Sequence, residues 1–442
     1  MNTDPQKQPA GRLAFSSSHP SLHAGEPHVT LSWPTESATR VPYAVFFDPA
    51  IHEQEQERLF RGPTWNYVAL EAEVANPGDF KATFVGDTPI VVTRNKDGAL
   101  HAFINRCAHR GALVCREVRG NKATHVCVYH QWSYDLTGNL IGVPFKKGIA
   151  GKGGYPSDFD SSQHSLQKLN VASYQGLVFV SFDVGVEPLE EYLSATIHPW
   201  LDQIFNRPIR VLGHSRQFIN ANWKLYAENV RDPYHASLLH LFHTTFGMYR
   251  SSQGGGVKMD PKKRHSVLHA YRLSEAEELA AYKDADLRTY KSKYTLADPS
   301  LLQGRQEFPG ITILTVFPCL VVQQIQNTLA VRHIVPKGVD QFELIVTHFG
   351  YEDDDAEMQQ VRIKQANLIG PAGLISMEDG HAAEIVQQAI VRDTHSSSLI
   401  EMGGREIDDQ DNLVTETGIR GFWQHYRHLM AFPERQERNG QE

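Results

Sequence analysis

The chain has 442 residues, of which 41% are hydrophobic, and a formal net charge of −8. This length allows two or three domains with sizeable cores, and the acidic balance argues against a nucleic-acid-binding surface. No apolar run approaches the ~20 residues of a membrane span, and the N-terminus lacks the apolar core of a signal peptide. We therefore expect a cytoplasmic protein with neither a nucleic-acid nor a membrane partner.

The first part of the chain changes pattern twice. Residues 1–40 are rich in Pro, Ser, Thr and Gly without periodicity, which predicts a flexible arm. A helical pattern at 48–61 then predicts an N-terminal helix within residues 41–63, and from residue 64 the pattern becomes one of short strands and turns. Strands are predicted at 88–95, 99–105 and 176–183. We expect an all-β domain over residues 64–183.

The second part of the chain, residues 184–435, mixes helices and strands irregularly. Strands are predicted at 214–220, 312–327, 329–337 and 342–351, and helices at 233–245, 356–370 and 381–390. This irregular order favours an α+β domain rather than a doubly wound sheet.

Two Cys/His doublets lie in the predicted β domain, Cys107-Ala-His109 and Cys127-Val-Tyr-His130. Two Cys on one iron and two His on the other are the ligands of a Rieske [2Fe–2S] cluster. Zinc accepts the same four residues, but zinc fingers usually pair Cys with Cys and His with His. The mixed doublets therefore favour the cluster, with zinc as the alternative. The remaining cysteines, Cys115 and Cys319, are expected to be buried free thiols, and no disulfide framework is predicted.

A second constellation reads Asp232-Pro-Tyr-His235-Ala-Ser-Leu-Leu-His240. Two His and one carboxylate commonly hold a non-haem Fe(II) that binds O₂, although two His at this spacing are often structural. Pro233 suits a first helical turn with Asp232 as its N-cap. On a regular helix the two imidazoles would point about 140° apart. We therefore predict a π-type or irregular turn near residues 236–240.

These segments resemble the alpha subunits of Rieske-type aromatic ring-hydroxylating oxygenases, over nearly the whole chain after the N-terminal arm. The resemblance rests on Cys107-Ala-His-Arg-Gly, Cys127-Val-Tyr-His-Gln-Trp-Ser-Tyr and the segment from Asn222-Trp-Lys to His235. Gln131 stands where the family usually has Gly. The resemblance implies an all-β Rieske domain inserted near the N-terminus of a helix-grip-like catalytic domain with an antiparallel sheet.

The resemblance also implies roles for particular residues. It assigns the [2Fe–2S] cluster to Cys107, His109, Cys127 and His130, and one mononuclear Fe(II) to His235, His240 and Asp379. Glu378 is the alternative carboxylate, and a plain helix cap is the ordinary explanation of Asp379. Asp232 is expected to bridge His235 to a neighbouring subunit's His130 in a head-to-tail trimer. His243 fits no position of the family's site.

The implied reaction is hydroxylation of an aromatic ring with O₂ and electrons from a separate NAD(P)H-dependent reductase, with or without a ferredoxin. The chain has no G-x-G-x-x-G in a strand–helix setting, since Gly254-Gly255-Gly256 is a plain run, so the nucleotide is expected to bind the reductase. The assembly expected for such chains is a homotrimer, as α₃β₃ with a small subunit.

The resemblance is closest to oxygenases of aromatic carboxylates, the group acting on terephthalate, anthranilate and salicylate. It favours terephthalate-type 1,2-dioxygenation to a cis-dihydrodiol. The alternatives are salicylate monohydroxylation, dioxygenation of anthranilate or another benzoate, and Rieske-type demethylation. Arg332 would bind one carboxylate and Arg420 a second, although an internal salt bridge or an edge-strand surface position would explain Arg332, and a role apart from the substrate would explain Arg420. Further substrate contacts are expected from Gln324, Ser376, Phe242, Phe246 and Met248, although core packing would explain the apolar ones.

Overall fold

The structure is a computed structural model that describes residues 31, 33–34, 38–246, 248–274, 277, 280, 307–308, 310–370 and 374–432. These residues belong to two compact units: residues 67–186 form unit 1, and residues 31–66 with 187–432 form unit 2. No described helix has both the length and the apolar character required to cross a bilayer.

Most of the expected N-terminal arm lies outside the described residues. Its described positions are packed rather than free. Trp33 is fully buried, with its ring centroid 5.9 Å from that of Trp423, and Thr39 is also buried. Arg40 begins the first strand. An indole with no exposed surface stabilises the fold through burial, so the expectation of a flexible arm fails at these positions.

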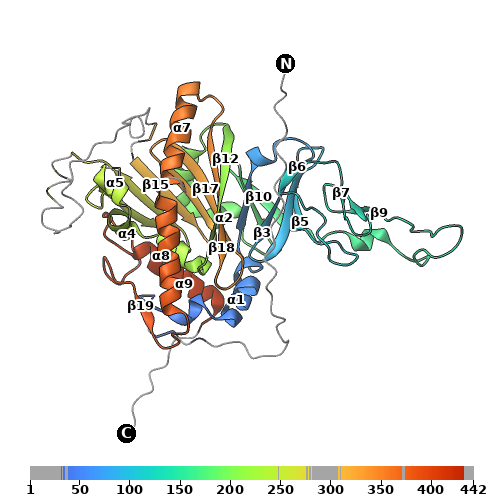
Figure 1. The fold of residues 1–442 in the computed structure, drawn as a ribbon, viewed down its shortest axis with the longest axis horizontal. Helices are drawn as coiled ribbons and strands as arrows, with labels where there is room; N and C mark the ends of the chain where they lie inside the picture. Colours follow the sequence, from blue (N-terminus) through green and yellow to red (C-terminus); the bar gives the residue numbers. More distant parts are fainter. Residues whose placement is uncertain are drawn as a thin grey trace, which may run out of the picture. The chain divides into compact units, whose positions relative to one another are not determined.

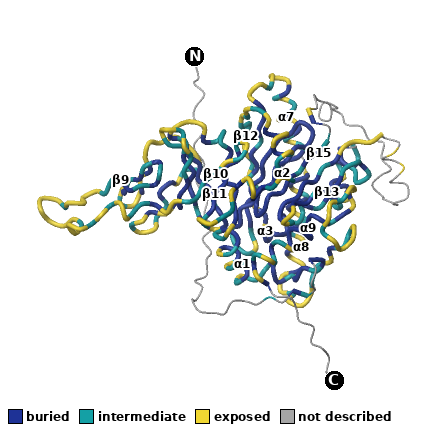
Figure 2. Tube along the Cα trace, turned by 180° about the vertical axis from the view of Figure 1, so that it is seen from behind, coloured by how far each residue is buried: buried dark blue, intermediate teal, exposed yellow. Residues whose placement is uncertain are grey.

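The regular secondary structure of unit 1 is mostly short strands, joined by loops (Figure 1). Its elements are β2 (Asn66–Leu70, whose first residue belongs to unit 2), η3 (Glu71–Glu73), β3 (Asp79–Val85), β4 (Thr88–Arg94), β5 (Leu100–Ile104), β6 (Arg119–Asn121), β7 (His125–Val126), β8 (Ser133–Tyr134), β9 (Leu140–Gly142), η4 (Ser161–His164), β10 (Asn170–Tyr174) and β11 (Leu177–Ser181). They form three small sheets, ordered β10-β11-β2, β5-β4-β3-β6 and β7-β8-β9. The strands predicted at 88–95, 99–105 and 176–183 are confirmed as β4, β5 and β11. Between β9 and η4 the chain is largely exposed (Figure 2).

Unit 2 is organised around a seven-stranded antiparallel sheet, ordered β12-β18-β17-β16-β15-β14-β13. Its strands are β12 (Ile209–Ile219), β13 (Gly254–Met259), β14 (Ser266–Tyr271), β15 (Gly310–Val316), β16 (Leu320–Ile325), β17 (Thr328–Pro336) and β18 (Phe342–Tyr351), and a separate pair joins β1 (Arg40–Pro42) to β19 (Ser397–Leu399). The predicted strand 312–327 is wrong in one respect. It is a hairpin of β15 and β16, because Pro318 has no N–H to continue a ladder.

Several helices of unit 2 pack on this sheet. The helices of unit 2 are η1 (Tyr43–Phe46), α1 (Pro49–Glu55), the π-helical η2 (Gln56–Phe60), α2 (Leu189–Ile204), α3 (Trp223–Asn229), α4 (Pro233–Leu239), α5 (Leu241–Thr245), α7 (Ala356–Ile369), α8 (Ile375–Ile390) and α9 (Thr417–Met430). Helix α3 contacts β17, α7 contacts β17 and β18, and α8 contacts β12. Figure 1 shows α7 and α8 running along the sheet. The mixture of helices with an antiparallel sheet confirms the predicted α+β class.

A buried ion pair connects helix α1 to helix α3, and a further hydrogen bond connects α1 to α9. Glu55, at the end of α1, accepts hydrogen bonds from Lys224 Nζ at 2.5 Å and from the Tyr426 hydroxyl at 2.5 Å. The Trp223 indole also donates to Glu55, at 2.9 Å. Both Glu55 and Lys224 have no exposed surface, and burial lowers the pKa of Lys224. Two charges in this setting need each other, since removing either leaves an uncompensated buried ion.

We predict that Lys224→Met lowers the free energy of unfolding by roughly 3–5 kcal/mol, because it leaves the Glu55 carboxylate buried without its cation. Chemical denaturation measures this loss. The matched control is Lys258→Met, whose ion pair with Asp409 is about half exposed and should cost at most about 1 kcal/mol. The double variant Glu55→Gln/Lys224→Met should recover part of the loss. A Lys224→Met effect no larger than the control would contradict this account.

Candidate metal centres

The two Cys/His loops of unit 1 have the same backbone turn. Gly111 N–H donates to Cys107 O, and Gln131 N–H donates to Cys127 O, each at 2.9 Å. The donor residue has a positive φ in both loops, 73° at Gly111 and 57° at Gln131. Gly adopts this conformation freely, whereas Gln meets a steric cost of about 1–2 kcal/mol. The departure from the usual Gly at position 131 therefore leaves the shape of the loop unchanged.

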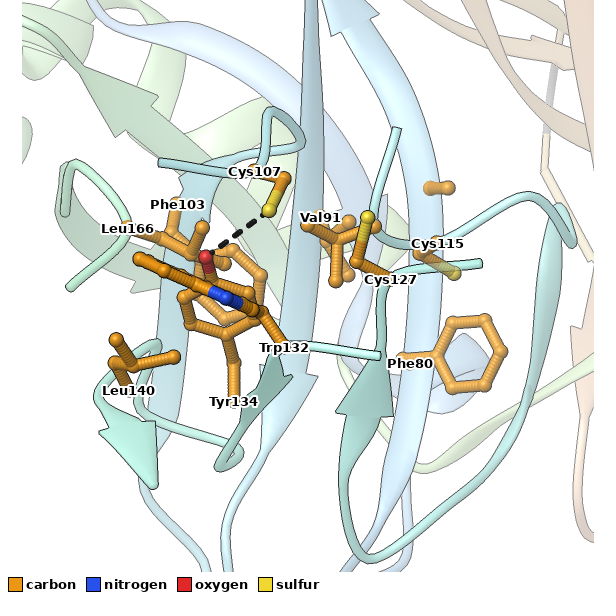
Figure 3. Close-up of a cluster of buried hydrophobic side chains, with 12 residues drawn as sticks. Phe80, Val91, Phe103, Cys107, Cys115, Cys127, Trp132, Tyr134, Leu140 and Leu166 are labelled. Atoms are coloured by element: carbon orange, nitrogen blue, oxygen red, sulfur yellow. Dashed lines mark hydrogen bonds between the residues drawn. The ribbon is translucent and has the colours of Figure 1, made fainter. Parts of the chain in front are cut away.

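The two thiols of these loops are buried beside a tyrosine (Figure 3). Cys107 and Cys127 are 3% and 1% exposed. The Tyr134 hydroxyl lies 3.3 Å from Cys107 Sγ and accepts a hydrogen bond from Ala108 N–H at 3.1 Å. Burial raises the pKa of Tyr134, so its hydroxyl stays protonated and can donate to a sulfur. Sequence analysis did not assign Tyr134 a role, although it lies within the quoted motif.

The two imidazoles of the loops lie together as well. The ring centroids of His109 and His130 are 4.4 Å apart, and Trp132 stacks on His109 at 4.8 Å with an interplanar angle of 7°. His109 Nδ1 is buried and has no hydrogen-bond partner among the described residues. A buried ring nitrogen without a partner is costly unless something binds it. Two thiols, two imidazoles and this unpaired nitrogen fit the donor set of a [2Fe–2S] cluster.

In unit 2 the helix carrying the second motif is interrupted at its second histidine. Helix α4 ends at Leu239, His240 has non-helical angles (φ −85°, ψ 71°), and α5 begins at Leu241. The predicted irregular turn is therefore confirmed. Asp232 caps α4, accepting from Tyr234 N–H at 2.8 Å, as its sequence context predicts.

This interruption brings both histidines to one carboxylate. Asp379 Oδ1 lies 3.5 Å from His235 Nε2 and 3.2 Å from His240 Nε2. One ligand atom from each of the three residues lies within 4.8 Å of the others, as a bound metal ion requires. Asp379 is located within α8, not at its start, so the alternative explanation of a helix cap is wrong.

Each histidine also meets a carboxylate through its other ring nitrogen. Asp232 Oδ2 lies 3.2 Å from His235 Nδ1, and Glu378 Oε2 lies 2.8 Å from His240 Nδ1. Both Nε2 atoms are thereby left facing Asp379. Carboxylates in such positions fix the tautomer and orientation of metal-binding imidazoles. Glu378 therefore orients His240 in this structure, a role that sequence analysis missed.

The electrostatics of this triad suit a divalent cation. Burial alone would lower the pKa of His235, but the contacts with Asp232 and Asp379 raise it to about 10. Burial alone would raise the pKa of Asp379, and the two histidines lower it instead. Asn229 Nδ2 donates to Asp379 Oδ1 at 3.2 Å. A divalent cation bound here would displace the His235 proton and leave two neutral imidazoles and one carboxylate, the donors typical of non-haem Fe(II).

A cavity opens onto the triad. Its apolar walls include four sheet positions, Leu268, Ile311, Ile313 and Ile325, together with Val230, Ala236 and Ile375. Arg332 also lines it and is 6% exposed. The Arg332 guanidinium donates to the Tyr226 hydroxyl at 2.8 Å and to Gln323 Oε1, and no described acidic residue forms an ion pair with it. The cavity thus combines an apolar slot with one buried cation.

Arg420, expected to bind a second carboxylate, does not line this cavity. It has no exposed surface and donates to the backbone oxygens of Met402 and Glu406, at 3.0 Å each. Gln324 is also displaced from the cavity, since its side chain donates to Gly310 O and Gln326 O. Side chains alternate along a strand, so Gln323, one residue earlier on β16, is the glutamine that reaches Arg332.

The remaining expected substrate contacts are likewise absent from the described lining of the triad's cavity. Ser376 Oγ donates to Gln217 Oε1 at 2.9 Å. Phe242 and Phe246 pack on each other, with centroids 4.8 Å apart. Met248 lines a separate, smaller cavity. His243, for which the family resemblance gave no position, does line the triad's cavity; its burial and the neighbouring His240 lower its pKa to about 3.

The fold and the two sites define an iron protein with two centres, a cluster domain and a 2-His-1-carboxylate domain. Residues 64–157 match the family described as "Rieske [2Fe-2S] domain", and residues 189–432 match "Ring hydroxylating alpha subunit (catalytic domain)". The chain therefore belongs to the ring-hydroxylating oxygenase alpha subunits. It is an oxidoreductase that incorporates O₂, with one Rieske cluster and one mononuclear non-haem iron site.

Characterised relatives agree with this family. The chain is 53% identical to the anthranilate 1,2-dioxygenase large subunit of Burkholderia cepacia, over 90% of this chain and 95% of the relative. It is 47% identical to the terephthalate 1,2-dioxygenase terminal oxygenase component subunit alpha 2 of Comamonas sp, over 91% and 98%. It is 43% identical to the salicylate 5-hydroxylase large oxygenase component of Ralstonia sp, over 90% and 96%.

A solved structure shares the fold. Naphthalene 1,2-dioxygenase from Rhodococcus sp. bound to indole superposes with a TM-score of 0.73 at 23% sequence identity, covering 88% of this chain and 94% of that one. At this identity the likeness concerns the arrangement of elements. It supports the expected architecture of a Rieske domain followed by a catalytic domain of mixed helices and antiparallel strands.

We predict that Asp379→Ala lowers the iron content from about three to about two atoms per chain, because only the mononuclear site depends on this carboxylate. Elemental analysis gives the iron content, and visible absorption reports the cluster, which should be retained. His381→Ala is the matched control, since His381 is an exposed residue on the same helix. Unchanged iron in Asp379→Ala would contradict the assignment of Asp379.

Proposed function

We propose that this chain is the terminal oxygenase subunit for an aromatic monocarboxylate of the benzoate type, hydroxylated with O₂ and electrons from a separate reductase. The observation that carries the proposal is Arg332, a buried cation in an apolar cavity beside the triad. A buried charge needs a counterion, and no described acidic residue pairs with this one. A substrate carboxylate supplies the missing anion, and a guanidinium can bind it through two parallel hydrogen bonds.

The position of Arg420 favours one carboxylate over two. The expected para-dicarboxylate, terephthalate, needs a cation at each end of its ring. Arg420 instead contacts backbone carbonyls, away from the cavity walls. The relatives include proteins named for anthranilate and for salicylate, which each carry a single carboxylate. Both observations support a substrate with one carboxylate in place of the terephthalate that we expected from the sequence.

Different residues of the chain are proposed to bind the substrate and to hold the two metal centres. When bound, the cluster supplies single electrons and the mononuclear iron binds and activates O₂. Arg332 anchors the carboxylate, and the isoleucine walls hold the ring and exclude water. His235, His240 and Asp379 are proposed to hold the iron, and Glu378 fixes the orientation of His240. The cluster is proposed to be held by Cys107, His109, Cys127 and His130.

Electron transfer is proposed to cross between subunits of a head-to-tail trimer, from one subunit's His130 through Asp232 to His235. Asp232 Oδ2 already faces His235 Nδ1, and the Asp232 side chain keeps 16% of its surface exposed. The cluster end of unit 1 also exposes apolar side chains, including Val128 (59%), Tyr129 (58%) and Phe145 (68%). Exposed apolar surface of this kind is typical of a protein contact. A small beta subunit and a reductase, with or without a ferredoxin, complete the proposed system.

The substrate is tested by supplying benzoate, anthranilate, salicylate and terephthalate to the protein with a reductase and identifying the hydroxylated products. One of the three monocarboxylates should be turned over with a kcat/KM at least about tenfold above that of terephthalate, because Arg332 is the one guanidinium among the described residues that line the cavity. Preferred turnover of terephthalate, or of a neutral aromatic, would overturn the monocarboxylate assignment.

We predict that Arg332→Gln raises the KM for the aromatic acid by roughly 30-fold or more, since a charged hydrogen bond to a buried partner contributes about 2 kcal/mol or more. Arg332→Lys should recover only part, because an ammonium lacks the planar fork. Arg210→Gln, on the exposed face of β12, is the matched control. Steady-state kinetics with the preferred acid measure the KM of each variant. An unchanged KM in Arg332→Gln would show that Arg332 does not bind the substrate.

We predict that Asp232→Asn keeps both metal centres but slows turnover at least about 100-fold, because a neutral amide has a single acceptor oxygen and cannot accept from His235 and a neighbouring imidazole at once. Stopped-flow absorption follows reoxidation of the pre-reduced cluster with substrate and O₂ present. The cluster should reoxidise slowly while the iron content stays normal. Near-normal reoxidation would count against the bridge, and lost iron would show that Asp232 acts only on the metal site.

A further inference from the structure

His243 is the cavity residue that the proposed machinery does not use. It lies on α5, directly after the turn at His240, and is only 4% exposed. It lines the same cavity as Arg332 and the triad. The break in the helix at His240 separates α5 from α4, and His243 follows it by three residues. Its place in the wall raises the question of what it binds.

The Nε2 atom of His243 is buried and has no hydrogen-bond partner within the described part of the chain. Leaving a buried polar atom unpaired costs roughly 1–3 kcal/mol, so native proteins rarely keep one without a purpose. Its polar neighbours in the cavity are engaged: Asn229 donates to Asp379, and the Tyr249 hydroxyl donates to Pro233 O. His243 therefore offers a hydrogen-bonding atom that the protein itself does not saturate.

His243 is not placed as a fourth ligand of the metal. The metal-binding group comprises His235, His240 and Asp379, without His243. The ring centroid of His243 is 6.3 Å from that of His240, whereas the rings of His235 and His240 are 5.2 Å apart. Unlike those two, His243 forms no ion pair with a described carboxylate. Its free nitrogen is left for a molecule that enters the cavity.

We propose that His243 is a specificity-determining residue, whose Nε2 forms a hydrogen bond with an amino or hydroxyl substituent on the ring of the aromatic acid. This inference rests on the proposed function, in which Arg332 binds the carboxylate. The two residues together select an acid with a second polar group. A neutral imidazole nitrogen either donates or accepts, and amino and hydroxyl groups do both, so either tautomer can form the bond.

The test measures binding, which needs neither reductase nor turnover. Isothermal titration calorimetry on the iron-loaded, full-length protein gives dissociation constants for benzoate and for the 2-, 3- and 4-isomers of aminobenzoate and hydroxybenzoate. For wild type, at least one substituted isomer should bind about tenfold more tightly than benzoate, the gain expected when a buried unpaired atom finds a partner. Tighter binding of an aminobenzoate or of a hydroxybenzoate shows which group His243 recognises, and the preferred isomer shows its position on the ring.

Three variants separate recognition from packing. His243→Leu should abolish the preference for the substituted isomer while leaving benzoate binding within about twofold. His243→Gln, whose amide can still form the bond, should restore part of the preference. His269→Leu is the matched control, since His269 stacks on Trp200 and does not line the cavity. Iron content should be unchanged in all three, which a role in supporting His240 would not predict.

Each other outcome overturns the proposal in a recognisable way. If His243→Leu weakens benzoate and the substituted acids equally, His243 is a packing residue. If the wild-type preference is missing, or survives in His243→Leu, then Nε2 is satisfied by water and does not select the substrate. In these cases benzoate still binds, and the proposed function stands. If wild type binds no aromatic acid, both the proposed function and this inference fail.

Discussion

The structure depends on one local constraint, the break in helical geometry at His240. Two imidazoles five positions apart on a regular helix would point about 140° apart and could not share a metal ion. Because α4 ends at Leu239 and α5 restarts at Leu241, both Nε2 atoms face Asp379 Oδ1, at 3.5 and 3.2 Å. His243, three residues after His240, lines the cavity next to this break. The grouping of the three proposed metal ligands thus follows from a single interrupted turn.

Carboxylates on both sides of the triad hold this geometry. Asp232 and Glu378 each lie against the Nδ1 atom of one histidine. The Nε2 atom of each ring therefore points toward Asp379. Asp232 has a second task, because its other oxygen caps α4. The cluster loops achieve rigidity differently, through a repeated backbone turn at Gly111 and Gln131 and a tyrosine hydroxyl beside Cys107. Each centre is preorganised by groups that do not themselves bind iron.

Most of the metal chemistry could be predicted from the sequence, because ligand residues and helix caps are local patterns. The doublets, the cap at Asp232 and the irregular turn each follow from a few neighbouring residues. Long-range partners could not be predicted: the contact between Glu378 and His240 spans 138 positions, and only packing of α8 creates it. Sequence alone could not show which glutamine of β16 reaches Arg332. Side chains alternate along a strand, so an error of one residue in register exchanges Gln323 for Gln324. The contacts of Arg420 with backbone carbonyls could not be predicted either, because backbone acceptors leave no signal in the sequence.

The central claim is that one iron ion is held by His235, His240 and Asp379, at the end of a cavity that also contains Arg332. Anomalous diffraction at the iron edge, on crystals of the iron-loaded protein, tests it most directly. The account predicts one isolated iron peak within bonding distance of both Nε2 atoms and the Asp379 carboxylate, besides the peak of the two-iron cluster between the cysteine loops. A cluster peak alone, or an isolated iron bound through Glu378 or His243 instead, would contradict it.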